Sequence, residues 1–139
     1  MESFKFSMPI QIRWNDLDAL GHVNNAIFIT YFEIARGYFM LKACEQWDWK
    51  KDMFLIGNVN ADFQKELLLT SEDPRVHVRT QKMGTKSFVL EYLITSKKGD
   101  EMVIHSSGTT TQIMFDTKTK STIEIPSWVR SSLTAFDKL

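Results

Sequence analysis

Residues 13–25 read Arg-Trp-Asn-Asp-Leu-Asp-Ala-Leu-Gly-His-Val-Asn-Asn. This stretch is polar and turn-rich, and it carries two aspartates, Asp16 and Asp18, two positions apart. It joins an alternating apolar segment to the longest helical pattern in the chain. The first turn of a helix has unpaired backbone N–H groups and a partial positive charge. A carboxylate loop that leads directly into such a turn is suited to acyl chemistry.

The segment that follows, residues 26–45, has the pattern of a buried helix. Most of its residues are apolar or aromatic, and the polar positions Thr30, Glu33 and Arg36 recur every three residues as one narrow stripe. A helix that is apolar over most of its circumference is enclosed by other structure. The two asparagines that precede it are competent N-caps. Gly37 interrupts the pattern of helix-forming residues and indicates close packing against a strand.

Five segments have the alternation of half-buried strands. They are residues 4–14, 54–66, 75–82, 87–96 and 101–115. Pro9 predicts an edge position or a bulge for the first strand. Short loops that contain glycine join the last three strands and predict an antiparallel meander. A short C-terminal helix is expected through Phe136, with Ser127 as its N-cap.

This order of elements predicts an α+β fold. The natural arrangement is an antiparallel sheet with one long helix packed on a single face, followed by the short helix. A lone helix that is apolar nearly all round requires the sheet to curl around it. The remaining sheet edge favours self-association. We find no repeat or linker, so residues 1–139 are expected to form a single domain.

Composition excludes several classes of protein. Lysine plus arginine and aspartate plus glutamate number 17 each, so no global charge favours nucleic acid as a partner. Cys44 is the only cysteine and lies in an apolar helical run, which indicates a core residue. No run approaches the roughly 20 apolar residues of a membrane span. A cytoplasmic location is the expectation.

The chain resembles the hot-dog-fold acyl-CoA thioesterases of the 4-hydroxybenzoyl-CoA thioesterase type. The matching pattern is Asp-x-Asp-x-x-Gly-His-Val-Asn-Asn at residues 16–25, followed by Tyr-Phe-Glu-x-Ala-Arg at residues 31–36. Weaker similarity continues through residues 59–67, 84–87 and 108–126. The resemblance implies five antiparallel strands wrapped around the long helix, and a homodimer whose sheets join edge to edge. It also implies active sites at the subunit boundary, and dimers of dimers are common in the family.

The same resemblance implies roles for individual residues in hydrolysis of an acyl-CoA. The second aspartate of the pair carries the catalysis, which corresponds to Asp18, and the backbone N–H near Asn25 holds the thioester carbonyl oxygen. No cofactor is implied beyond the CoA portion of the substrate. Members specific for 4-hydroxybenzoyl groups carry aromatic and proline residues where this chain has Asn24, Asn25 and Ala26. That departure concerns the acyl group and leaves the hydrolytic residues in place.

The residues themselves leave alternatives open. A carboxylate serves as a nucleophile or as a general base, but Asp18 is also a residue type that holds a turn through Asx hydrogen bonds. Asp16 is expected to fix the loop or pair with Arg13. His22 is a general-base candidate or a loop histidine bonded to backbone. Asn24 is expected to act as cap and loop scaffold, or as a substrate contact.

Further polar residues are weaker candidates. Glu33 is expected to pair with Arg36 on the helix, although a related thioesterase group places its carboxylate on this helix. Asp62 is expected to be exposed or paired. His77 and His105 lie in alternating strands without a third ligand at metal spacing, so we predict no metal.

A basic turn is the predicted site for the nucleotide phosphates of CoA. It comprises Lys82, Thr85, Lys86 and Ser87, and the alternative is ordinary solvated turn charge. The acyl chain is not fixed by the sequence. Four phenylalanines, Phe28, Phe32, Phe63 and Phe88, are expected to pack in the core, with an apolar tunnel as the alternative.

Two other functions remain open. An acyl-carrier-protein thioesterase would have the same loop and a different partner, and a non-catalytic hot-dog protein would bind acyl thioesters without turnover. The intact Asp18 argues against a pure binder. A hydratase is disfavoured because none of the three histidines has a matching surrounding motif.

Overall fold

The structure is a computed structural model that describes residues 3–139. Its elements follow the predicted order, with two short additions, η1 and β6. In chain order they are β1 (Phe6–Pro9), η1 (Trp14–Asp16), α1 (Asn25–Ala43), β2 (Phe54–Phe63), β3 (Glu72–Met83), β4 (Ser87–Lys98), β5 (Glu101–Asp116), β6 (Ser121–Thr122) and α2 (Ser127–Asp137).

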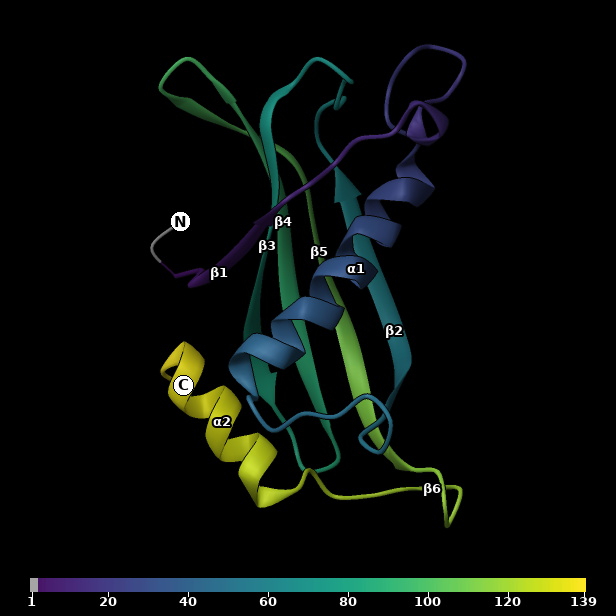
Figure 1. Cartoon of the computed structure of the whole chain (residues 1–139), viewed down its shortest axis with the longest axis vertical. Helices are drawn as coiled ribbons and strands as arrows, with labels where there is room; N and C mark the ends of the chain where they lie inside the picture. Colours follow the sequence, from purple (N-terminus) through teal and green to yellow (C-terminus); the bar gives the residue numbers. More distant parts are fainter. Residues whose placement is uncertain (1–2) are drawn as a thin grey trace.

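The strands form one antiparallel sheet in the order β1-β3-β4-β5-β2, and the short β6 pairs with β5. Strands β3, β4 and β5 are joined by the two predicted hairpins. Within residues 3–139, strand β2 pairs with β5 alone, so its second edge is free. Figure 1 shows α1 crossing one face of this curled sheet, with α2 beside its lower end. The predicted α+β architecture is confirmed.

Helix α1 packs on the sheet through one aromatic face. Phe28, Phe32 and Phe39 are buried, and Phe32 stacks on Tyr92 of β4 with ring centroids 4.6 Å apart. Gly108 of β5 permits this close approach, because a Cβ there would lie 2.6 Å from the Phe32 ring. The burial of these large rings favours folding of the helix onto the sheet.

The structure corrects several local predictions. Strand β1 pairs over only four residues, since regular pairing with β3 stops at Pro9. Gly37 has no atom within 4 Å of an added Cβ, so close packing against a strand is wrong. Ser127 is the first residue of α2, and Pro126 occupies the N-cap position. The outer face of α1 is also uncovered in a single chain, where Ile34 and Tyr38 are exposed.

The polar loop 13–25 and the β3–β4 turn lie at opposite ends of the sheet. The polar loop 13–25 and the segment 64–71 lie at the upper end in Figure 1, where β2 ends and β3 begins. The β3–β4 turn lies at the lower end, where the guanidinium of Arg130 in α2 donates to the Gly84 carbonyl at 2.7 Å. Among residues 3–139, no helix is long and apolar enough to cross a membrane.

Candidate active site

The polar loop folds into a tight turn that ends at the start of α1. Leu17 and Val23 form an antiparallel bridge, and the Asp18 N–H donates to the His22 carbonyl at 2.7 Å. Gly21 has φ +80°, which an L side chain rarely adopts, and its N–H donates to the Asp18 carbonyl at 3.0 Å. Backbone hydrogen bonds within the turn therefore help to fix its conformation.

Asp16 is the buried anchor of this loop. Its side chain is 1% exposed, and it accepts hydrogen bonds from the Arg13 backbone N–H at 2.9 Å and from the Tyr31 hydroxyl at 2.7 Å. The Arg13 guanidinium lies 3.1 Å from the same carboxylate. Burial by itself raises the pKa of Asp16, but the hydrogen bonds from Arg13 and Tyr31 outweigh it and lower the pKa. Asp16 thus pairs with Arg13 and fixes the loop.

Asp18, in contrast, faces solvent. Its Oδ1 accepts the backbone N–H groups of Leu20 at 2.9 Å and His22 at 3.1 Å. Both bonds use the same oxygen, and within residues 3–139 no donor is found for Oδ2. The carboxylate is therefore held in a fixed orientation with one oxygen available for chemistry. The turn-holding and reactive interpretations of Asp18 are compatible in this geometry.

The start of α1 has one available donor between occupied ones. Asn24 is the N-cap, and its Oδ1 accepts the Ala26 N–H at 2.9 Å, as a capping asparagine does. The Asn24 N–H itself donates to the Asp16 carbonyl at 2.9 Å. For the N–H of Asn25, the first residue of the helix, no acceptor is found in the described part of the chain. Its position at a helix N-terminus suits it to a developing negative charge.

The segment 64–71 braces the loop from the side of the sheet. The Val23 N–H donates to the Leu67 carbonyl at 2.8 Å, and His22 forms a bridge with Leu68. The His22 ring is half-buried, and the hydrogen bonds found for this residue in the described chain use its backbone. Asp18, His22, Asn24 and Asn25 are therefore brought together within one hydrogen-bonded unit.

The residues expected to bind CoA phosphates lie elsewhere. The β3–β4 turn and its flanks contain Lys82, Thr85, Lys86 and Ser87. This turn lies at the opposite end of the sheet from the polar loop 13–25. Part of this backbone is bonded to later segments of the chain, since the Thr85 carbonyl accepts the Ile125 N–H at 2.9 Å and the Lys86 carbonyl accepts the Met114 N–H at 2.9 Å. The lysine side chains are exposed. One chain does not bring this turn and Asp18 together.

The weaker candidates have ordinary environments. Glu33 lies 3.8 Å from the guanidinium of Arg36, as the helix spacing predicts. Asp62 is exposed. Cys44 is buried, and burial, followed by the nearby charge of Asp52, raises its pKa to about 12, which keeps the thiol protonated. The prediction of Cys44 as a core residue is confirmed.

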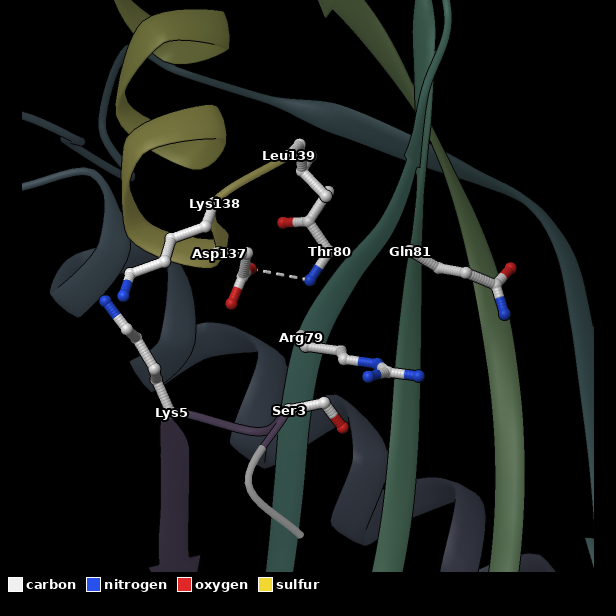
Figure 2. A pocket seen from close by; sticks show the side chains of 8 residues that line it. All are labelled: Ser3, Lys5, Arg79, Thr80, Gln81, Asp137, Lys138 and Leu139. Atoms are coloured by element: carbon white, nitrogen blue, oxygen red, sulfur yellow. Dashed lines mark hydrogen bonds between the residues drawn. The ribbon is translucent and has the colours of Figure 1, made fainter.

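Two of the pockets formed by the described residues lie away from Asp18. A cavity of about 620 Å³ between β1 and α1 is lined by Met8, Ile10 and Ile34 and reaches the buried side of Asp16. Figure 2 shows a smaller pocket of about 320 Å³ between β3 and the end of α2. There the Thr80 N–H donates to Asp137 at 2.7 Å, a contact that ties the C-terminal helix to the sheet.

Sequence reasoning misses the polar role of Tyr31. The helical pattern places the residue on the apolar face, and its ring is indeed buried. Its hydroxyl, however, reaches Asp16 across 15 positions of sequence. The only signal is the rule that a buried tyrosine hydroxyl usually finds a hydrogen-bond partner. That rule does not identify which of the neighbouring carboxylates is the partner.

Comparison with known proteins identifies the class of this fold. A thioesterase from Thermus thermophilus, solved with coenzyme A and zinc, superposes with a TM-score of 0.85 at 26% identity over 100% of this chain and 98% of its own. A thioesterase superfamily protein from Jannaschia sp. CCS1 gives 0.86 at 25% identity, covering 98% and 85%. The chain therefore has the hot-dog fold that the sequence pattern implied.

The family follows from the sequence itself. Residues 12–133 match the model of the thioesterase-like superfamily, and the chain belongs to that family. It is also 28% identical over 98 residues to the uncharacterized protein YsmA of Bacillus subtilis strain 168. That match covers 70% of this chain and 66% of YsmA, slightly less than two thirds of the relative's length.

Proposed function

We propose that this protein hydrolyses an acyl-CoA thioester to a free acid and CoA, with Asp18 as the reactive carboxylate. The observation that carries the proposal is that one loop holds both a carboxylate oxygen and a backbone N–H to which no hydrogen bond is found in the described chain. These are the second carboxylate oxygen of Asp18 and the backbone N–H of Asn25 at the helix start. Membership of the thioesterase-like superfamily supports this chemistry.

Thioester hydrolysis needs both groups. When an oxygen nucleophile adds to the thioester carbon, the carbonyl oxygen becomes negative, and the Asn25 N–H stabilises that charge together with the helix dipole. The C–S bond then breaks and CoA leaves as the thiolate. Asp18 acts either as a general base that takes a proton from the attacking water, or as the nucleophile itself. In the second route water hydrolyses the resulting anhydride, so both routes consume one water.

We infer CoA as the carrier from similarity. The Thermus thioesterase of the same fold was solved with coenzyme A. The turn that contains Lys82 and Lys86 offers two exposed ammonium groups for phosphates, and the Thr85 and Ser87 side chains supply hydroxyl donors. An acyl carrier protein would present the same thioester on a protein surface, so comparison of the two carriers belongs in the test.

A second copy of the chain would complete the site. The free edge of β2 and the adjacent inner face expose Ile56, Val59 and Phe63, of which Phe63 packs 5.7 Å from Phe28 beside the helix start. Antiparallel pairing of two β2 edges would cover these side chains and form a continuous sheet. The two-fold rotation that relates the two chains in such a pair would reverse the direction of the partner's sheet. The partner's β3–β4 turn would then lie toward the end that holds this chain's Asp18.

The proposed dimer also affects which of the four phenylalanines considered as tunnel residues could contact an acyl group. Phe28, Phe32 and Phe88 are buried in the core of the single chain, whereas Phe63 is 41% exposed. Phe63 is therefore the one of the four that could contact an acyl group at the subunit boundary. Its size would limit the chain that the boundary accepts, which makes it the first position to vary once a substrate is known.

The test is a panel of short, branched, long and aromatic acyl-CoAs, together with acyl carrier protein esters, assayed by release of free thiol. We expect turnover of at least one acyl-CoA and a higher kcat/KM for CoA esters than for carrier protein esters. Stabilisation of the protein by acyl-CoA without thiol release would contradict the proposal and identify a binding protein. Preference for the carrier protein esters would contradict the assignment of CoA.

A further inference from the structure

Strand β5 contains a β-bulge at His105, next to the segment that braces the active-site loop. Ile94 of β4 pairs with Ser106 and Thr95 pairs with Ile104, so His105 is the extra residue between them. A bulge leaves its extra residue out of the ladder and re-aims its groups. The released His105 carbonyl accepts the N–H groups of Gln64 at 2.9 Å and Lys65 at 3.3 Å.

The imidazole of His105 binds the same segment. Nδ1 lies 3.0 Å from the Glu66 carbonyl oxygen and 3.3 Å from that of Lys65. Because a carbonyl only accepts, Nδ1 carries the proton, and in a neutral ring Nε2 is then an acceptor. The Ser96 hydroxyl, 2.7 Å away, donates to Nε2. His105 and Ser96 are both buried, at 3% and 5% exposure, so this pair is not accessible to a substrate.

The segment held by His105 is directly connected to the active-site loop. Leu67, the next residue after Glu66, is fully buried, and its carbonyl accepts the Val23 N–H at 2.8 Å. Val23 immediately precedes Asn24, the N-cap of α1, and Asn25, the first residue of the helix. A continuous path of hydrogen bonds and adjacent residues therefore runs from Ser96 through His105 and Leu67 to the helix start.

We propose that His105 is a positioning residue that clamps residues 64–67 against Val23 and thereby fixes the Asn25 N–H for catalysis. The role requires the neutral ring with its proton on Nδ1, since only that form donates to Glu66 while accepting from Ser96. Burial, only partly offset by the Lys65 and Glu66 carbonyls, lowers the pKa of His105, which is consistent with a neutral ring. The kinetic part of this proposal rests on the proposed thioesterase activity.

Three variants and a control distinguish the loss of the His105 contacts to residues 64–67 from a general loss of protein stability. His105→Leu removes the bonds to both Glu66 and Ser96, whereas His105→Asn retains a donor at the position of Nδ1. Ser96→Ala removes one donor and is the mildest change. His77→Leu is the control, because His77 is the other described buried histidine, is bonded to the Thr95 hydroxyl at 2.9 Å, and has no hydrogen bond to residues 64–67.

The first readout, amide hydrogen exchange at Val23, does not depend on activity. We expect exchange to accelerate about tenfold in His105→Leu, less in Ser96→Ala, and to return toward the wild-type rate in His105→Asn. The rate in His77→Leu should change only as far as global stability changes. Unchanged exchange in His105→Leu would overturn the proposal. So would an equal acceleration at Val23 in His77→Leu that exceeds what its change in global stability accounts for.

The second readout is the division between kcat and KM with an acyl-CoA that the wild type hydrolyses. For His105→Leu we expect kcat to fall about tenfold and KM to stay within about twofold, because a displaced oxyanion donor affects the transition state. A wild-type kcat in that variant would overturn the positioning role. If Val23 exchange responds as expected but the wild type hydrolyses no thioester, the structural role of His105 is supported and the proposed function is wrong.

Discussion

Tyr31 connects helix α1 to the polar loop through one buried hydrogen bond to Asp16. Its hydroxyl donates to Asp16 at 2.7 Å, and burial followed by that bond raises the pKa of Tyr31, so the hydroxyl stays protonated. We expect Tyr31→Phe to lower the free energy of unfolding by about 1–3 kcal/mol, because a buried carboxylate loses a donor. Urea denaturation measures this loss.

Tyr38→Phe is the matched control for Tyr31→Phe. Tyr38 lies on the same helix and is 58% exposed. Its substitution should change the free energy of unfolding by less than about 0.5 kcal/mol. Equal losses in the two variants would show that the Asp16 contact contributes nothing particular.

The two aspartates illustrate what residue chemistry predicts. The expectation that Asp16 fixes the loop or pairs with Arg13 is confirmed. The sequence could not show that Asp18 would hold its turn through one oxygen and leave the other available, because that depends on the conformation of residues 18–22. The catalytic assignment of Asp18 therefore came from the family resemblance and stays a prediction.

At the scale of elements, the start of α1 permits a test of a backbone group. Asn24 has φ −62° and ψ 139°, an extended conformation that a following proline accepts, and proline fits the first position of a helix. We therefore expect Asn25→Pro to fold and to lose the proposed oxyanion N–H. Its kcat should fall about 10²–10³-fold.

Asn25→Ala is the control for that substitution, since it retains the backbone N–H and removes only the side chain. Its kcat should stay within a few fold of the wild type, and circular dichroism and thermal unfolding should confirm that both variants fold. Comparable kcat values for Asn25→Pro and Asn25→Ala would exclude the Asn25 N–H as the oxyanion donor.

The helix start was predictable within one residue because capping by asparagine is a local signal. Strand limits were less predictable, since they depend on partners distant in sequence. Residues 4–14 alternate throughout, yet pairing stops at Pro9. The bulge at His105 was also hidden, because an alternating segment gives no indication of which residue will be left out of register.

At the scale of the whole molecule, two buried histidines make stability depend on pH. Burial, with the nearby charge of Arg75, lowers the pKa of His77 to about 4 against the opposing charge of Asp73, and burial also lowers that of His105. Between about pH 6.5 and 4 the unfolded chain then binds more protons than the folded one, so stability falls as pH falls. His77 accounts for up to about 3 kcal/mol of this loss.

Comparison of the wild type with His77→Leu isolates that contribution. Urea denaturation between pH 7 and 4 should show a shallower decline of the unfolding free energy in the variant. Parallel curves for the two proteins would mean that His77 titrates normally in the folded state.

The proposed dimer permits a second test at the scale of the whole molecule. Val59 pairs with the buried Thr110, so its side chain lies on the inner face of β2, where it is 42% exposed. We expect Val59→Lys to weaken the proposed dimer by at least about tenfold, because a charge would be buried at the boundary. Analytical ultracentrifugation measures the dissociation constant, and activity should fall in parallel.

Met102→Lys provides the control for the dimer, since Met102 is similarly exposed but lies near the start of β5, away from the β2 edge. This variant should associate and act like the wild type. A fully active monomer, obtained by dilution or by Val59→Lys, would contradict a site shared between subunits.

The fold as a whole was predictable because element order and the loop pattern agree. The location of the β3–β4 turn relative to the polar loop 13–25 was not predictable, since only the tertiary structure shows that they lie at opposite ends of the sheet. A site built from two chains, as proposed here, would divide its residues between copies. No pattern within one sequence records that division.

The most direct test of the central claim compares Asp18→Asn with the wild type at saturating acyl-CoA. An amide cannot serve as base or nucleophile, so kcat should fall about 10²–10⁴-fold, while the affinity for a non-hydrolysable CoA analogue stays within about twofold. Asp100→Asn, an exposed aspartate in the β4–β5 turn, should retain wild-type kcat. An Asp18→Asn variant that releases thiol at the wild-type rate would contradict the account.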